Sequence, residues 1–286
     1  MKRSIQIELY GFDAFKKKLP LVKAAGFDCI DIYLSTGSCC ENNFRDHITE
    51  VREAIEGVGL YCATTHLTMY DPLISSEKKD DKVEAAIRHA VSATALLGAE
   101  VAAFHARTSI STGYDWRISY QENREALLPL VDLAVKENVK IAVENIPIFP
   151  DCPIHRFYTS DPDDICELVD SFDTPHVGVC WDTGHANLMS FDQPKVIRQM
   201  GHRLIATHLS SNFKEQDWHL PPVFGYIDWA KIMAAFADIG YAGTLNLEVG
   251  HSRIPESALG SFFRLCYDSA VYLEELFEKR KSELQR

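Results

Sequence analysis

The chain has 286 residues, a net charge of −12 and a sequence pI near 5.4. The acid excess argues against a broad basic surface for nucleic acid, and no run approaches the roughly 18 apolar residues of a membrane-spanning helix. The N-terminus has no long apolar core of the kind that signal peptides carry. We therefore expect a cytoplasmic protein that binds neither membranes nor nucleic acid.

No linker or low-complexity stretch divides the sequence, so a single domain is expected over residues 1–286. Eight cysteines are present, but Cys29, Cys62, Cys166 and Cys180 lie in apolar segments, and no CxxC pair exists. Buried, reduced thiols are predicted rather than a disulfide framework. A homo-oligomer is compatible with these features.

Eight short apolar runs follow one another along the chain, and each precedes a polar loop and a stretch with helical spacing, such as 83–97 or 120–135. The runs span residues 5–9, 27–34, 60–68, 100–105, 140–146, 177–181, 204–209 and 243–249. Glycines that can take the left-handed closing conformation end four of the expected helices: Gly26, Gly59, Gly98 and Gly240. Eight such units in a chain of this length predict an α/β fold, a single (β/α)8 TIM barrel.

Side chains that can bind a metal recur near the ends of six of these runs. They are His66, His105, Glu144, Asp182, His208 and Glu248, at intervals of 39, 39, 38, 26 and 40 residues. An interval near 40 is about the length of one strand, one helix and two loops. Because catalytic groups of such barrels lie at the C-terminal ends of the strands, these side chains are expected to meet at one rim.

Two of the six are glutamates that follow apolar strand residues. Glu144 comes after Ile-Ala-Val, and Glu248 lies within Leu-Asn-Leu-Glu-Val. A carboxylate buried there is unfavourable unless it is paired, protonated or bound to a cation, and an exposed position just past the strand is the alternative. Two glutamates that face each other across a barrel mouth could remove and return a proton on a bound carbon acid.

The segment Cys-Trp-Asp-Thr-Gly-His at 180–185 is the most specific of the chain. Asp182 ends the sixth run, and Gly184 is expected to permit a tight turn that brings His185 back to the rim. A helix-capping Asp–His pair is the alternative to a metal site of oxygen and nitrogen ligands. His208 alone would be interpreted as a core histidine, but the three carboxylates favour a ligand.

Four further residues remain ambiguous in the sequence. Asp217 and His219 lie in the loop after the seventh run, where they could chelate an ion or belong to a surface turn. His66 and His105 are interpreted as substrate hydrogen-bonding or core residues rather than ligands.

Five short segments together resemble the xylose isomerase-like TIM-barrel superfamily, and within it the sugar phosphate isomerase/epimerase group. They are Glu-Asn at 144–145, Trp-Asp-Thr-Gly-His at 181–185, His-Leu-Ser at 208–210, Asp-Trp-His-Leu-Pro-Pro at 217–222 and Leu-Glu-Val at 247–249. The resemblance runs over nearly the whole chain and is strongest from Glu144 to Glu248. It implies that Glu144, Asp182, His208 and Glu248 bind one divalent ion; mixed carboxylate and imidazole ligation suits Mn²⁺, Zn²⁺, Co²⁺ or Mg²⁺. It also implies that the two glutamates are acid/base groups and that His185 holds a substrate oxygen.

The implied function is isomerisation or epimerisation of a sugar or sugar phosphate by metal-dependent proton transfer through an enediolate. The ketose 3-epimerase branch of the superfamily carries a second glutamate six residues after the strand-five glutamate, where this chain has Pro150, and an arginine after the strand-seven histidine, where this chain has a loop with Lys214. The residues expected to contact substrate at the rim, besides His185, are Arg107, Trp116, Phe149, Trp181 and Lys214.

A second branch of the same superfamily, the endonuclease IV-like apurinic endonucleases, uses three zinc ions for phosphodiester hydrolysis. The segment Pro-Pro-Val-Phe-Gly at 221–225 is apolar where the nuclease pattern is rich in glycine, and no strongly basic loop flanks the expected site. The isomerase reading is therefore preferred. The nine-ligand pattern of the nuclease branch can nevertheless be laid on His66, His105, Glu144, Asp182, His185, His208, Asp217, His219 and Glu248.

Overall fold

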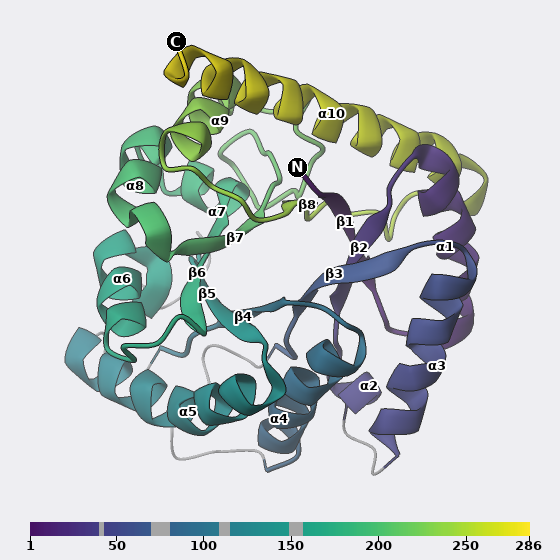
Figure 1. Ribbon diagram of the computed structural model, residues 1–286, viewed down its shortest axis with the longest axis horizontal. Coiled ribbons are helices and arrows are strands. Elements are labelled where there is room, and N and C mark those ends of the chain that lie inside the picture. The colour runs from purple at the N-terminus through teal and green to yellow at the C-terminus, as the bar shows by residue number, and fades with distance from the viewer. Residues whose placement is uncertain (40–42, 70–80, 109–114, 149–156) are drawn as a thin grey trace.

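Eight parallel strands form a nearly closed barrel with helices around it, so the expected (β/α)8 fold is confirmed (Figure 1). The computed structural model describes residues 1–39, 43–69, 81–108, 115–148 and 157–286. The strands are β1 (Arg3–Glu8), β2 (Cys29–Tyr33), β3 (Tyr61–His66), β4 (Val101–His105), β5 (Lys140–Glu144), β6 (Val177–Asp182), β7 (Leu204–His208) and β8 (Leu245–Leu247).

Consecutive strands are hydrogen-bonded neighbours from β1 to β7, and β1 also pairs with β8. Beyond the end of β7, a parallel bridge joins Leu209 to Leu247 and brings the last strand back beside the seventh. This near closure places the carboxyl ends of all eight strands around one mouth.

Helices cover the outside of the barrel, and those that close at Gly26, Gly59, Gly98 and Gly240 take the predicted positive φ at these residues. The longer helices are α1 (Phe12–Ala25), α3 (Phe44–Gly57), α4 (Asp81–Leu96), α5 (Trp116–Glu137), α6 (Pro162–Asp170), α8 (Gln193–Met200), α9 (Trp229–Asp238) and α10 (Leu259–Leu284). Short helical turns are α2 (Thr36–Cys39), η2 (Tyr158–Ser160), α7 (Thr183–Leu188), η3 (Gly201–Arg203) and η4 (Glu256–Ala258). None of the helices in the described ranges is long and apolar enough to cross a membrane.

Helix α5 begins four residues before its apolar periodicity indicates. The side chain of Asp115 accepts a hydrogen bond from the Arg117 amide and so caps the first turn. The cysteines in the described part of the chain are all free thiols, as predicted, and Cys29, Cys62 and Cys180 are buried, whereas Cys166 is only partly buried.

Small side chains fill the barrel between its two ends. A buried cluster separate from the main core consists of Val101, Ala103, Ala142, Cys180 and Ala206. Strand residues alternate between the barrel interior and the helix layer, so Ala142 and Cys180 face the same interior as Glu144 and Asp182 one pleat further along. The small side chains thus form the floor of the site.

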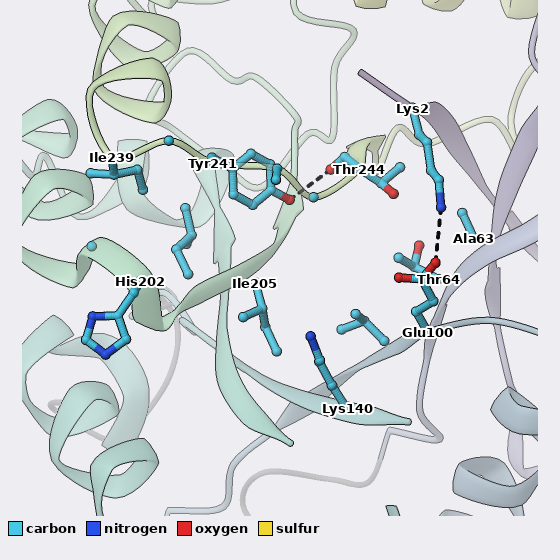
Figure 2. Close-up of a pocket in the computed structure, with 16 residues that line it drawn as sticks. Lys2, Ala63, Thr64, Glu100, Lys140, His202, Ile205, Ile239, Tyr241 and Thr244 are labelled. Carbon is cyan, nitrogen blue, oxygen red and sulfur yellow. Dashed lines mark hydrogen bonds and ion pairs between the residues drawn. The ribbon is translucent and has the colours of Figure 1, made fainter. Parts of the chain in front are cut away.

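A cavity of about 410 Å³ opens at the N-terminal end of the barrel, on the far side of this floor (Figure 2). Its lining includes Thr64 and Lys140, and the Lys2 ammonium donates to Glu100 across it at 3.2 Å. Because catalytic groups of (β/α)8 enzymes lie at the opposite, C-terminal end, this cavity is not the candidate active site.

Candidate metal centre and substrate cavity

Six side chains from successive strand ends meet at the C-terminal mouth of the barrel, as predicted. Five are the last residues of β3 to β7, and the sixth directly follows β8: His66, His105, Glu144, Asp182, His208 and Glu248. Within this group, one ligand atom from each of Glu144, Asp182, His208 and Glu248 lies within 4.8 Å of the others. The structure therefore brings together the four residues that the family resemblance implies as ligands of a single ion.

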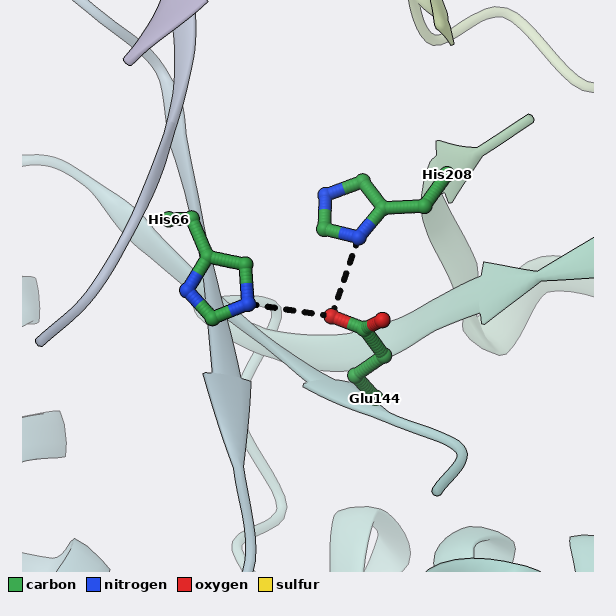
Figure 3. A group of neighbouring side chains, drawn as sticks. All are labelled: His66, Glu144 and His208. Atoms are coloured by element: carbon green, nitrogen blue, oxygen red, sulfur yellow. Dashed lines mark ion pairs between the residues drawn. The ribbon is translucent and has the colours of Figure 1, made fainter. Parts of the chain in front are cut away.

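Glu144 is fully buried at the centre of this arrangement. Its Oε2 lies 3.0 Å from His208 Nδ1 and 3.4 Å from His66 Nε2 (Figure 3). The same His208 nitrogen lies 2.8 Å from Glu248 Oε2. Within the described residues, however, neither Glu144 oxygen accepts a hydrogen bond, and neither does Asp182 Oδ2 or Glu248 Oε2. These buried oxygens lie close together without hydrogen-bond partners, which is an arrangement that a cation would satisfy.

The ring orientations of three histidines fit the same interpretation. Each Nδ1 lies 2.7–3.0 Å from a backbone carbonyl oxygen. A carbonyl can only accept, so Nδ1 carries the proton in each neutral ring and Nε2 presents a lone pair to the site. These bonds join His66 to Leu67, His185 to Asn145, and His219 to Glu248.

Asp182 has two functions at the end of β6. Its Oδ1 accepts the His185 amide at 2.7 Å and caps α7, so the capping interpretation of the sequence is confirmed for this oxygen. Its Oδ2 is buried with no hydrogen-bond partner among the described residues. The Asn145 amide group then fixes the backbone of Asp182, donating to its carbonyl at 2.9 Å and accepting from its N–H at 2.7 Å. Sequence reasoning gave Asn145 no role.

Gly184 is required for a reason other than the expected tight turn. It lies inside α7 and is not among the glycines with positive φ. A Cβ at this position would lie 2.3 Å from Ser210 Oγ and 3.2 Å from Asp182 Oδ1. Glycine is therefore needed because α7 packs closely against the segment after β7, and the prediction of a special backbone conformation was wrong.

Further ligand groups adjoin the four-residue set. Asp217 Oδ2 lies 3.1 Å from His185 Nε2 and 2.9 Å from His219 Nε2, and these three residues form a second potential metal-binding group. His66 joins Glu144 and His208 in another. His105 is also close to this third group, since its Nε2 lies 3.3 Å from Glu144 Oε2. All nine residues of the wider pattern therefore gather at one mouth.

The protonation of these groups reflects their burial and mutual contacts. Burial raises the pKa of Asp182 to about 7, with a further rise from the Glu248 and Glu144 carboxylates. Burial would lower the pKa of His219, but Asp217 and Glu248 outweigh it and raise that pKa to about 10. Without a cation the cluster therefore retains protons near neutral pH, and a bound cation would displace them.

A cavity of about 430 Å³ lies beside the cluster and opens on three of its members, Asp217, His219 and Glu248. This volume is within the usual range of small-molecule sites. The remaining lining residues are Gln6, Glu8, Tyr10, Tyr33, Met69, Gln216, Trp218, Val249, Gly250, Ser252 and Arg253. Sequence reasoning missed Glu8, although it ends the first strand just as the predicted ligands end theirs.

The expected rim contacts need correction. Trp181 is fully buried and donates from Nε1 to Gln193 at 3.2 Å, because its position in β6 alternates with those that face the barrel interior. Arg107 forms an ion pair with Glu84 of α4. Lys214 is exposed and does not line the cavity. Trp116, at the start of α5, is 40% exposed and is likewise not part of the lining. Phe149 and Pro150 lie outside the described residues.

Comparison with known proteins identifies the family. The sequence profile of the xylose isomerase-like TIM barrel matches residues 19–264. The chain belongs to this family. As a member of it, the chain shares 27% identity over 177 residues with a mannonate dehydratase of Enterococcus faecalis, covering 57% of this chain and 46% of that protein. It shares 33% identity over 142 residues with an uncharacterized protein of Sinorhizobium fredii, covering 50% of this chain and 43% of that protein. The chain thus spans less than half the length of these curated relatives.

Solved structures of similar fold include several sugar epimerases. A D-tagatose 3-epimerase-like protein superimposes with a TM-score of 0.73 at 20% identity, covering 99% of this chain and 100% of that one. A D-psicose 3-epimerase crystallised in the presence of D-fructose gives a TM-score of 0.74 at 17% identity, covering 97% of this chain and 99% of that one. At such identities the likeness establishes the fold alone.

Proposed function

We propose that this family member is a divalent-metal-dependent isomerase or epimerase of a small carbohydrate. The observation that carries the proposal is that Glu144 and Glu248, from strands on different sides of the mouth, both contact His208 Nδ1, at 3.0 and 2.8 Å. They share one candidate ion site with Asp182, and Glu248 also lines the cavity. A sequence relative named as a D-psicose 3-epimerase, 35% identical over 82 residues, supports the same reaction class.

Glu248, Glu144 and His185 have separate roles in the proposed proton transfer. When bound, a divalent ion supplies positive charge that polarises substrate oxygens and acidifies the C–H between them. Glu248, 15% exposed at the cavity wall, takes the proton from the carbon next to the carbonyl. Glu144, protonated in the reacting form, donates its proton to the opposite face of the enediolate or to the neighbouring carbon, and exchange with solvent then returns both glutamates to their starting states. His185, whose Nδ1 donates to the Asn145 carbonyl, would contact a substrate hydroxyl at Nε2, which in the free protein lies 3.1 Å from Asp217 Oδ2.

The reaction class can be tested without knowledge of the natural substrate, because an enediolate mechanism exchanges a carbon-bound hydrogen with solvent. We expect metal-loaded protein to incorporate deuterium from D₂O into at least one member of a panel of ketoses, aldoses and their phosphates. Proton NMR would locate the exchange at the carbon beside the carbonyl. Chelation should stop it, and added Mn²⁺, Co²⁺, Mg²⁺ or Zn²⁺ should restore it. If metal-loaded protein exchanges hydrogen in no member of the panel, the proposal is wrong.

Endonuclease IV-like phosphodiester hydrolysis is a second candidate, and one observation favours it. His185, Asp217 and His219 form a ligand group that the single-ion site does not use. Against it, the described lining of the cavity contains carboxylates and only one arginine, the exposed Arg253, and the chain carries a net charge of −12. Phosphate groups of DNA would meet little positive charge here.

Metal stoichiometry separates the two candidates. We expect elemental analysis to find about one divalent ion per chain after dialysis, held by the four-residue set. The substitution His219→Gln removes a member of the second ligand group only, so it should leave the metal content unchanged. About three zinc ions per chain, reduced by His219→Gln, together with cleavage of DNA at abasic sites, would establish the nuclease instead.

A further inference from the structure

Glu8, at the end of β1, carries a charge that the proposed reaction does not use. Its side chain is 20% exposed, and its Oε2 lies 3.3 Å from Lys18 Nζ of α1 and 2.9 Å from His251 Nε2. Lys18 Nζ and His251 Nε2 are themselves 2.8 Å apart, and His251 is buried. Burial would raise the pKa of Glu8, but His251 and Lys18 outweigh it and lower that pKa to about 2. Glu8 is therefore a fixed carboxylate at neutral pH.

This carboxylate belongs to the lining of the same cavity that opens on Glu248 and His219. Lys18 and His251 are not part of that lining, so the cavity meets the carboxylate and not the two side chains that hold it. Both of these contacts fall on Oε2. Among the described lining residues the only arginine, Arg253, is exposed, and there is no lysine.

The rest of the lining suits a neutral, hydroxyl-rich molecule. Tyr10, Tyr33 and Trp218 supply aromatic faces, and Gln6 supplies an amide that is oriented by its 3.0 Å bond to Asp31. A carboxylate accepts hydrogen bonds from hydroxyl groups and repels a phosphate. Ligand sites commonly combine such apolar surfaces with a few placed polar groups that determine specificity.

We propose that Glu8 is a specificity-determining residue, which accepts hydrogen bonds from substrate hydroxyl groups remote from the reacting carbons and selects an unphosphorylated sugar over its phosphate ester. The proposal rests on the proposed function, because it assigns the substrate class of the same site. It narrows that function from sugars or sugar phosphates to free sugars.

Equilibrium binding tests this selectivity without requiring turnover. Calorimetry on the metal-loaded protein would compare D-fructose, D-tagatose and D-ribulose, each with the corresponding ester that carries a phosphate on the terminal carbon. At least one free sugar should bind about tenfold or more tightly than its ester, since a hydrogen bond to a charged group is worth about that factor or more. Equal or tighter binding of every ester, or no binding of any free sugar, would overturn the proposal.

The variant Glu8→Gln distinguishes recognition from a structural role. Its affinity for the free sugar should fall about tenfold, while its affinity for the phosphate ester should rise because the repulsion is gone. A folding defect would lower both affinities, so opposite changes are diagnostic. Glu8→Asp, which keeps the charge on a shorter side chain, should bind the free sugar less well and still reject the ester. Glu53→Gln, on the exposed face of α3, is the matched control and should change neither.

The same experiment separates this inference from the function on which it rests. If free sugars bind with the expected preference but exchange no hydrogen, the selectivity of Glu8 stands and the isomerase proposal fails. If exchange occurs and Glu8→Gln leaves both affinities unchanged, the isomerase proposal stands and the role of Glu8 is wrong.

Discussion

Glu144→Gln is expected to lower metal occupancy and to reduce hydrogen exchange by about 10²- to 10⁴-fold or more, because that range is the usual contribution of a positioned acid or base and loss of the metal adds to it. Glutamine keeps the shape of the side chain but has neither its charge nor its basicity. The loss should be large because Glu144 belongs to two of the three ligand groups and lies within 3.5 Å of nitrogens of His66, His105, His185 and His208. Its replacement leaves those imidazoles without their common anion.

Elemental analysis and the D₂O assay would follow metal content and exchange in parallel. Glu248→Gln should show a comparable loss of exchange, while Glu53→Gln, which removes an exposed glutamate of α3, should behave as wild type. Full metal content in Glu144→Gln would contradict the assignment of Glu144 as a metal ligand. Full hydrogen exchange with normal metal content would show that Glu144 is not an acid or base of the reaction.

Asp182→Asn is expected to stabilise the metal-free protein at pH 8 and to remove most of the stabilisation that added metal confers. Asparagine can still cap α7 with its oxygen, but it no longer buries a carboxylate. The pKa of Asp182 is raised from an ordinary 3.8 to about 7, so the protonated form contributes stability that is fully present below about pH 4 and is lost as the pH rises through 7. At 1.36 kcal/mol per pKa unit, the free energy of unfolding falls by about 4 kcal/mol between pH 4 and pH 7.

Thermal unfolding of chelator-treated and metal-loaded protein at pH 5 and pH 8 would measure both effects. Each change of 1 kcal/mol in the free energy of unfolding corresponds to a shift of roughly 2–4 °C in Tm for a domain of this size. The wild type should lose stability from pH 5 to pH 8 without metal and regain it with metal, whereas the variant should lose less stability over this range and gain little from metal. A variant less stable than wild type at pH 8 without metal would show that the buried charge is already compensated within the protein.

The barrel and the positions of the candidate ligands could be predicted because each depends on local sequence. Apolar runs followed by helical stretches define the strands, and a strand end fixes where its last side chain lies. The predicted positions of Glu144 and His208, at the ends of β5 and β7, are therefore confirmed. The same rule applied to β1 would have identified Glu8.

Other features depend on contacts between distant segments. The ion pair of Lys18 with Glu8 joins α1 to β1, and His251 reaches it from beyond β8. The prediction that Trp181 contacts substrate was wrong, because side chains alternate along β6 and the residue before Asp182 is buried on the helix side of the barrel. The steric need for Gly184 arises from Ser210, which follows another strand. No periodicity within one segment encodes such contacts.

The distribution of the ligands over β5 to β8 has a consequence for how the chain folds. Glu144, Asp182, His208 and Glu248 come together only when the later strands have paired and the last has returned beside the seventh. A metal ion would therefore bind the closed barrel and gain little from earlier intermediates. Interactions that form after the rate-limiting barrier leave the refolding rate nearly unchanged and slow unfolding. The ion would therefore stabilise the barrel kinetically after it has closed, and removal of the ion would shorten the lifetime of the native state.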